Sequence, residues 1–161
     1  MGYSGNEQFG EIKNFDLHVV EIDTNKPKTI YENKQIFVNA FPLTHKIPCY
    51  GFLFKEKERE RNIKKNMVEK YNIPVSQIHR IKQGEDYIID HNKKIPNHEL
   101  TLPPYKSRSY MYCTDTVYKP NLNNFINNVD LLYHEATFSH EDLSLARDTT
   151  HATAVQAAQT A

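Results

Sequence analysis

The chain has 161 residues, of which 39% are hydrophobic and 25% charged, and its formal net charge at neutral pH is zero. This length suffices for one domain with its own core, but the hydrophobic share lies below the roughly 45–50% of ordinary globular domains. We therefore expect a polar domain or one whose core is incomplete. No apolar run approaches the roughly 20 residues that cross a bilayer, so no membrane association is expected.

Two further features of composition concern the compartment. The first seven residues contain neither the basic nor the apolar region of a secretory leader. Two cysteines, Cys49 and Cys113, are too few for a disulfide framework. Together these features predict a reduced, cytoplasmic protein.

Charge is unevenly distributed along the chain. Residues 55–94 include 11 basic and 7 acidic side chains, whereas residues 121–161 include 1 basic and 5 acidic ones. Such asymmetry suggests one segment that meets a polyanion and another that holds cations. Charge alone favours the plainer interpretation that both segments are solvated surface.

The first half of the chain favours strands followed by a helix. Residues 29–31 and 36–41 have the composition of strands on either side of a polar turn, and residues 50–54 form an aromatic run typical of a third strand. Residues 55–71 are rich in Glu, Lys and Arg, which predicts an exposed helix. That helix should end before Pro74, because proline disfavours helical backbone at the preceding residue.

The second half begins with a polar stretch and then returns to regular structure. Residues 75–108 are predicted to be irregular and to form an insertion rather than core, and prolines are concentrated around them. Residues 109–113 and 129–133 are predicted strands. Residues 149–150 can cap a helix over 152–161 that begins with a turn carrying His151. It has no closing glycine and no basic last turn, so we expect the domain to extend beyond it.

Four polar side chains occupy positions where sites gather in α/β folds, at strand ends and helix starts. His45 lies in a turn between two predicted strands, Asp115 and His134 each follow a predicted strand, and His151 opens the predicted helix. Histidine nitrogen and aspartate oxygen together suit zinc, and a shared carboxylate can bridge two metals. Each residue alone also fits a plain role as a surface histidine, a turn residue or a cap.

The wording of four motifs, in the order in which they occur, resembles that of the ribonuclease Z family. Residues 41–52 resemble a ligand histidine placed ahead of a Gly-aromatic strand, and Tyr-Cys-Thr-Asp-Thr at 112–116 resembles the bridging-aspartate motif. Residues 132–138 contain a His-Glu-Ala-Thr signature, and Thr-His-Ala-Thr-Ala at 150–154 is similar to the final His-Ser/Ala-Thr motif. Four ordered motifs are far more specific than any one of them.

The resemblance implies an α/β metallo-β-lactamase fold, a sandwich of two β-sheets between helices (αββα). It implies cleavage of precursor tRNA after the acceptor stem, with two Zn²⁺ ions per complete active site. His45 resembles a ligand of the first zinc, His151 a ligand of the second, and Asp115 the bridge between them. His134 is similar to the residue that assists proton transfer to the leaving oxygen. Glu135 is expected to support it, because such histidines need orienting partners.

One family motif is absent from the chain. The family carries His-x-His-x-Asp-His in its amino-terminal half, which supplies several zinc ligands and the water-activating aspartate. No two of the eight histidines here are two residues apart. We therefore expect residues 1–161 to form a partial domain that lacks the amino-terminal half and exposes apolar surface on strands 36–41 and 50–54. With most zinc ligands missing, the chain alone should bind zinc weakly and be at best a poor enzyme.

The resemblance also interprets the basic insertion, at about residues 55–108. Family members carry there a protruding arm that grips tRNA, in a homodimer where one subunit's arm serves the other's site. Phosphate contacts of this kind give affinity and salt dependence rather than sequence choice. Glutamates interleave with the basic residues, so an ordinary charged helix explains the segment as well. The candidate phosphate contacts are Arg59, Arg61, Lys64, Lys65, Arg80 and Lys82.

Two other interpretations stay open. Relatives in the same superfamily hydrolyse small phosphodiesters or sulfate esters at a similar site, and the basic insertion favours tRNA over such substrates. Alternatively, the chain is a non-catalytic fragment or a nucleic-acid-binding module that uses the scaffold without metals.

Overall fold

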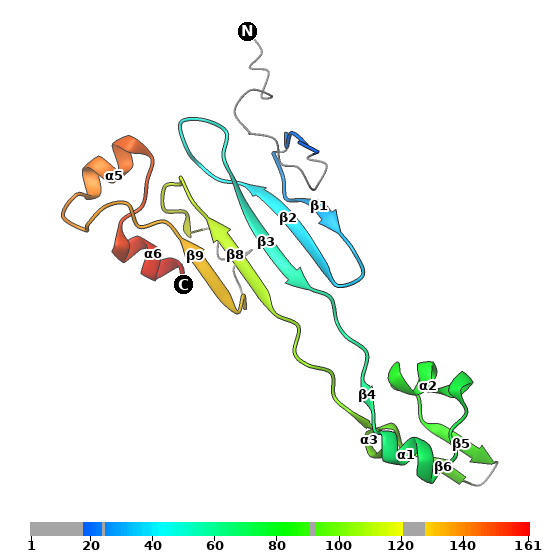
Figure 1. The fold of residues 1–161 in the computed structure, drawn as a ribbon. Helices are drawn as coiled ribbons and strands as arrows, with labels where there is room; N and C mark the ends of the chain where they lie inside the picture. Colours follow the sequence, from blue (N-terminus) through cyan, green and yellow to red (C-terminus); the bar gives the residue numbers. More distant parts are fainter. Residues whose placement is uncertain (1–17, 24, 91–92, 121–127) are drawn as a thin grey trace, which may run out of the picture.

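The fold centres on one five-stranded mixed sheet (Figure 1). The computed structural model describes residues 18–23, 25–90, 93–120 and 128–161. Residues 1–7, where the sequence predicts no secretory leader, lie outside the described residues. The strand order is β1-β2-β3-β8-β9, with antiparallel pairs throughout except for the parallel pair β8–β9. The strands are β1 (Lys28–Glu32), β2 (Ile36–Pro42), β3 (Tyr50–Glu56), β8 (Ser109–Cys113) and β9 (Leu131–His134).

The predicted strands are confirmed, with one shifted boundary. Strands β1, β2, β3 and β8 each contain the predicted run. The last strand begins at Leu131 rather than at Val129, because Asp130 is used for side-chain bonds to the start of β8. The Asp130 carboxylate accepts hydrogen bonds from the Ser109 N–H at 2.8 Å and from the Ser109 hydroxyl at 3.0 Å. Asp130 thereby aligns the two parallel strands at their amino-terminal ends.

Side chains alternate between the two faces of the sheet along each strand, and those on one face form a buried core. Phe41, Leu43, Met111 and Cys113 form a buried cluster there, against which Cys49, Leu53, Val129 and Leu132 pack. Gly51 pairs with Phe41 across β2 and β3, and a Cβ at Gly51 would lie 2.4 Å from the Phe41 ring. Glycine is therefore required at this position so that the ring can lie flat against the neighbouring strand.

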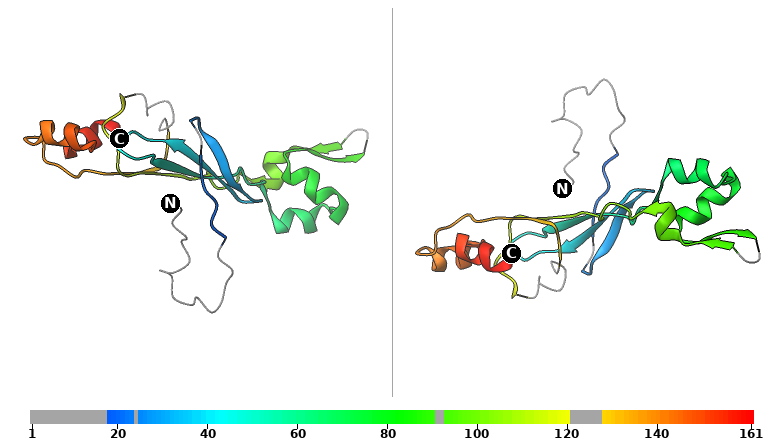
Figure 2. Two further views of the ribbon diagram at one scale, coloured as in Figure 1. Left: turned by 90° about the horizontal axis from the view of Figure 1, so that it is seen from above. Right: turned by 90° about the horizontal axis from the view of Figure 1, so that it is seen from below.

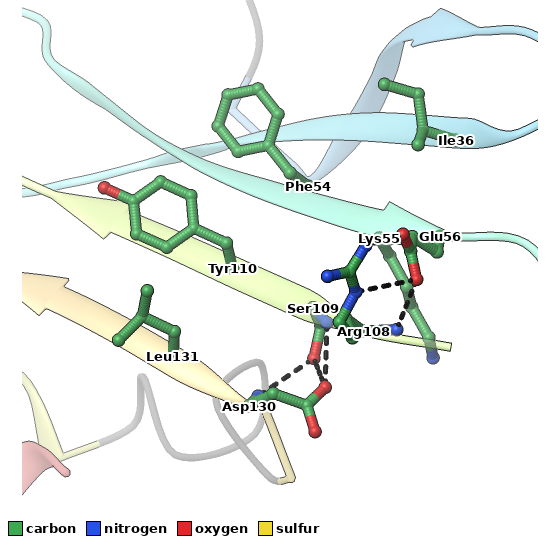
Figure 3. A pocket seen from close by; sticks show the side chains of 9 residues that line it. All are labelled: Ile36, Phe54, Lys55, Glu56, Arg108, Ser109, Tyr110, Asp130 and Leu131. Atoms are coloured by element: carbon green, nitrogen blue, oxygen red, sulfur yellow. Dashed lines mark hydrogen bonds and ion pairs between the residues drawn. The ribbon is translucent and has the colours of Figure 1, made fainter. Parts of the chain in front are cut away.

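The opposite face of the sheet is apolar and partly open, and we call it the aromatic face. Ile36, Phe54, Tyr110 and Leu131 come from four neighbouring strands and line a hollow of about 330 Å³ (Figure 3). The rings of Phe54 and Tyr110 stack at 5.8 Å, and those of Tyr112 and Tyr133 at 4.9 Å. Phe54 is 38% exposed and Leu131 is 62% exposed.

The predicted exposure of apolar strand surface is therefore confirmed for Phe54 of β3 but wrong for most of β2. Val38, Ala40 and Phe41 of β2 are buried. Strand β2 is paired on both edges, with β1 and β3, whereas Phe54 near the carboxyl end of β3 stays 38% exposed.

Two short helices follow β9 and correct the predicted helix start. They are α5 (Leu143–Thr149) and α6 (Ala154–Thr160). Thr150 ends α5 rather than capping the next helix, and His151 lies in the link between the two. The cap of α6 is Thr153, whose side chain accepts from the Gln156 N–H while the Gln156 side chain accepts from the Thr153 N–H. This reciprocal capping box fixes the start of α6 at Ala154, two residues later than predicted.

A separate lobe lies between β3 and β8, and we call residues 61–102 the arm lobe. It extends from the end of the sheet opposite to α5 and α6 (Figure 2). Ile73, Ile81, Ile95 and Leu100 form a core of its own. Its elements are β4 (Asn62–Ile63), α1 (Lys65–Lys70), α2 (Val75–Lys82), β5 (Tyr87–Asp90), β6 (Lys93–Ile95), α3 (Asn97–Leu100) and β7 (Thr101–Leu102).

The arm lobe corrects two predictions. A single helix over residues 55–71 is wrong, because Lys55 and Glu56 continue β3 and only α1 is helical. An irregular stretch over 75–108 is also wrong up to residue 102, because that part contains helices and strands, whereas residues 103–108 have neither. Asn97 holds the arm lobe together from inside: its buried side-chain amide donates to the carbonyls of Ile81 at 2.6 Å and Glu85 at 2.7 Å.

No helix among the described residues is long and apolar enough to cross a membrane.

Glu56 fastens the connection between the sheet and the arm lobe. Its carboxylate accepts hydrogen bonds from the Arg108 backbone N–H at 3.0 Å and from the Arg108 guanidinium at 2.6 and 3.2 Å (Figure 3). Arg59 donates to the same carboxylate at 3.1 Å. Hydrogen bonds from Arg108 lower the pKa of Glu56 from 4.5 to about 2.

This pKa predicts a specific loss of stability in acid. A carboxylate whose folded pKa is lowered stabilises the fold above its ordinary pKa of 4.5, and the contribution is lost as the pH falls toward 2. Glu56→Gln should therefore lower the melting temperature at pH 6, and the difference from wild type should shrink as the pH approaches 2.5. Thermal melts followed by circular dichroism across this range would show it. Glu58→Gln, at an exposed glutamate of the same segment, is the control, and a pH-independent difference for Glu56→Gln would contradict this role.

Candidate metal centre

Three side chains from three separate segments converge at the end of the sheet opposite to the arm lobe. His45 lies in the loop between β2 and β3, Asp115 follows β8, and His151 lies between α5 and α6. One ligand atom of each lies within 4.8 Å of the others, and the two imidazole rings lie 5.0 Å apart, edge to face. Two nitrogens and one oxygen at this spacing can hold a divalent metal, and they suit zinc.

Hydrogen bonds between two loops bring Asp115 beside His45. The Thr116 hydroxyl accepts from the Thr44 N–H at 3.2 Å, and the Val117 N–H donates to the Thr44 carbonyl at 3.1 Å. Asp115 itself has a φ of +50°, a left-handed conformation that aspartate tolerates better than most residues. The turn therefore lets the chain leave β8 sharply and places the Asp115 carboxylate at the edge of the sheet.

The carboxylate of Glu135 holds His151 in place. One oxygen accepts from the Thr116 N–H at 2.6 Å and from His151 Nδ1 at 2.9 Å. The other accepts from the Thr137 hydroxyl at 2.6 Å and from the Ala152 N–H at 3.2 Å. A single buried side chain therefore joins the turn after β8, the segment after β9 and the link between α5 and α6.

The balance of these interactions keeps Glu135 ionised. Burial raises its pKa, but the hydrogen bonds from Thr137, the Thr116 N–H, His151 and the Ala152 N–H outweigh burial, so the pKa lies below its ordinary value. An ionised carboxylate only accepts hydrogen bonds, so the bonded Nδ1 of His151 must carry the hydrogen. Nε2 of His151 is then left with the lone pair that a metal requires.

His134 lies beside the group of three but is not part of it. It ends β9 in register with Cys113 of β8. Its Nδ1 donates to the Glu135 backbone carbonyl at 2.7 Å, and its Nε2 is enclosed with no hydrogen-bond partner among the described residues. Glu135 thus supports His134 only through its backbone, while its carboxylate supports His151.

Comparison with known proteins gives these residues a family context. No family model matches the chain. It is 45% identical over 141 residues to the ribonuclease Z of Bacteroides thetaiotaomicron, a match that covers 88% of this chain and 45% of the relative. It is 41% identical over 155 residues to the ribonuclease Z of Porphyromonas gingivalis, which covers 96% of this chain and 51% of that relative. Along most of its length the chain is homologous to ribonuclease Z.

The match to ribonuclease Z has a defined extent. The chain spans about half the length of the curated relatives it matches, and this holds also for the ribonuclease Z of Prochlorococcus marinus, at 36% identity over 150 residues and 48% of that relative. A crystal structure of human tRNase Z, short form, has a TM-score of 0.45 at 19% identity, covering 84% of this chain and 35% of that one.

The six basic residues predicted to contact phosphate in a ribonuclease Z arm have different surroundings. Two of them hold the arm lobe together: Arg61 donates to the Thr101 hydroxyl at 2.7 Å, and Lys64 donates to the Glu99 carbonyl at 2.9 Å. The side chain of Lys65 is 92% exposed and lies 3.9 Å from Glu69 on the same helix. The remaining three are paired on the surface, Arg59 with Glu56, Arg80 with Glu85 and Lys82 with Glu60.

Inspection of the sequence missed the residues that orient the histidines. Thr150 contacts His45, and the backbone N–H groups of Thr116 and Ala152 help to hold Glu135. Thr150 lies next to His151, where the sequence predicts a helix cap. Its real partner lies 105 residues away in sequence, so no local pattern could have identified it.

Proposed function

We propose that this chain is part of a zinc-dependent endoribonuclease of the ribonuclease Z type, which removes 3′ trailers from precursor tRNA. The observation that carries the proposal is the convergence of His45, Asp115 and His151 within a chain that is 45% identical to a ribonuclease Z. Cys49 and Cys113 are both free thiols, in keeping with a cytoplasmic enzyme. The homodimer implied by the resemblance stays a prediction.

The side chains of the group fit a metal ion. His151 presents Nε2 because Glu135 holds its Nδ1, and the Asp115 carboxylate is exposed to solvent beside the two histidines. His45, Asp115 and His151 would hold the metal, which supplies Lewis acidity at the scissile phosphate when bound. In a complete site with two zinc ions, Asp115 is the group that would be shared between them.

His134 is proposed to supply the proton for the leaving oxygen. Its Nδ1–H is fixed on the Glu135 carbonyl, so Nε2 is the nitrogen that takes up and delivers a proton. When the phosphorus–oxygen bond breaks, that proton would go to the 3′-oxygen of the tRNA and leave a 3′-hydroxyl. Because Nε2 is enclosed in the described structure, the segments around it must give way when substrate binds.

The proposed fold is the metallo-β-lactamase sandwich, in which a second sheet would cover the aromatic face. The support is physical: Phe54, Tyr110 and Leu131 form an apolar surface that a single sheet leaves open, and two sheets bury such faces against each other.

The arm lobe is proposed to bind tRNA away from the scissile bond. It follows the carboxyl end of β3 and precedes the amino end of β8, whereas His45 and Asp115 lie at the other ends of these strands. A five-residue strand spans roughly 17 Å, so the arm lobe and the metal group lie at least that far apart along the sheet. This separation favours an extended tRNA over a small phosphodiester as the substrate.

The activity can be tested by joining this chain to the part of the Bacteroides thetaiotaomicron ribonuclease Z that it does not match. The chimera should release the 3′ trailer from precursor tRNA. Asp115→Ala should abolish both zinc loading and cleavage, because Asp115 acts through the metal. His134→Ala should keep the zinc but slow single-turnover cleavage by about 10²–10⁴-fold, the usual contribution of acid–base assistance.

Metal analysis beside single-turnover kinetics separates these outcomes. A folded, zinc-loaded chimera that leaves precursor tRNA uncut would contradict the proposed function. Loss of zinc in His134→Ala would instead contradict the proton-transfer role of His134 alone.

The arm lobe is tested in the same chimera by neutralising Arg59, Lys65 and Arg80 to glutamine. Each lost phosphate contact should lower the slope of log affinity against log salt by up to about 0.9, because fewer counterions are released. Hydrolysis of a small phosphodiester should not change, since it cannot reach the lobe. Lys28→Gln with Lys34→Gln, on the β1–β2 hairpin, is the control for loss of positive charge elsewhere on the surface. Equal losses on both substrates, or an unchanged salt slope for tRNA, would rule out a tRNA-binding role.

A further inference from the structure

Thr150 has an unusual backbone conformation. It ends α5 with φ +62° and ψ +41°, in the left-handed region. Glycine or asparagine is common at such a position, whereas a β-branched residue there is a genuine outlier. The helix end itself is completed by backbone bonds, from the Thr150 N–H to the Arg147 carbonyl and from the His151 N–H to the Ala146 carbonyl. Capping therefore does not explain why a threonine side chain is present.

The Thr150 side chain contacts His45. Its Oγ1 lies 2.7 Å from Nδ1 of His45 and 2.6 Å from the Thr149 carbonyl. A hydroxyl has one hydrogen to donate, and a carbonyl can only accept, so that hydrogen goes to Thr149. Oγ1 must then accept from a hydrogen on Nδ1 of His45.

The Thr150 backbone imposes the same tautomer. The Thr150 carbonyl lies 3.2 Å from Nδ1 of His45, and it too can only accept. Both oxygens of one residue therefore require the hydrogen on Nδ1. The lone pair is left on Nε2, the nitrogen that a histidine offers to a metal when Nδ1 is held in this way.

We propose that Thr150 is a positioning residue that fixes the tautomer and orientation of His45, and so presents its Nε2 to the metal. This inference rests on the proposed metal site. Thr150 does for His45 what Glu135 does for His151, and because Thr150 and His151 are adjacent, the link between α5 and α6 carries one histidine and orients the other. The strained conformation of Thr150 is what brings its hydroxyl and its carbonyl to the same nitrogen.

The tautomer can be read directly in the metal-free 161-residue chain. Long-range ¹H–¹⁵N correlation of labelled histidines, assigned with His45→Gln, should show hydrogen on Nδ1 of His45 in wild type. Thr150→Val keeps the shape and the β-branch but removes the hydroxyl, so only the longer 3.2 Å contact with the Thr150 carbonyl still favours hydrogen on Nδ1, and the population with hydrogen on Nε2 should rise. Thr150→Ser should restore the wild-type pattern. Thr149→Val is the matched control, because the Thr149 hydroxyl bonds only within α5, to the Leu145 and Ala146 carbonyls.

Metal binding gives a second readout. Affinity for Co²⁺, followed by its visible absorption, should fall by about 10–100-fold in Thr150→Val, the usual effect of losing a partner that orients a ligand. It should stay within about threefold of wild type in Thr150→Ser and in Thr149→Val, because both keep the hydroxyl that orients His45. If Thr150→Val does not fold, Thr150→Gly serves instead, since it relieves the backbone while lacking the hydroxyl.

The outcomes separate this inference from the proposed function. An unchanged His45 tautomer together with wild-type affinity in the hydroxyl-free variant would overturn the positioning role. Equal losses in Thr150→Ser and Thr150→Val would also overturn it, because they would show a purely structural need for threonine. A wild-type chain that binds no Co²⁺, but whose His45 tautomer shifts in Thr150→Val as expected, would support the positioning role and count against the metal site itself.

Discussion

The site depends on one buried negative charge, the carboxylate of Glu135. The side chain is 7% exposed, and removing a carboxylate from water is costly unless it is fully hydrogen-bonded. Here the donors are two backbone N–H groups, a hydroxyl and an imidazole, belonging to Thr116, Ala152, Thr137 and His151. These donors come from three segments, so they can reach one carboxylate only when the whole end of the sheet has formed. The arrangement of the site around Glu135 therefore depends on formation of the tertiary fold.

The sheet explains why this end, and not the other, carries the ligands. Strands β8 and β9 are parallel, so Asp115 and Glu135 leave the same edge of the sheet, just after the paired residues Cys113 and His134. The β2–β3 loop returns to that edge and brings His45. The arm lobe leaves from the other end and has a core of its own, so its shape does not depend on the metal group. Because the metal group and the arm lobe lie at opposite ends of the strands, the sequence of each can vary without disturbing the other.

The sequence predicted those features that follow from local patterns. Alternating and aromatic runs located the strands, and four ordered motifs singled out His45, Asp115 and His151, which the structure brings together. Charged composition wrongly predicted one helix over residues 55–71. The residues between β3 and α1 are not helical, because Glu56 ends β3 and is held by Arg108, which lies just ahead of β8. Glu135 was predicted as an orienting partner of His134, but its carboxylate holds His151, a contact set by the tertiary fold. The role of Thr150 could not be predicted, because it depends on a distant partner and a left-handed backbone.

The zinc affinity of Glu135→Gln, measured by titration calorimetry at neutral pH, tests most directly whether this carboxylate organises the site. Glutamine keeps the shape but turns one acceptor into an NH₂ group that faces existing N–H donors, at a cost of about 1.5–3 kcal/mol for a lost bond to a charged group. We expect zinc affinity to fall by at least about tenfold, because His151 loses the partner that orients it. Glu141→Gln, at an exposed glutamate, should bind zinc as wild type does. Wild-type zinc affinity in a folded Glu135→Gln chain would contradict the central role of Glu135.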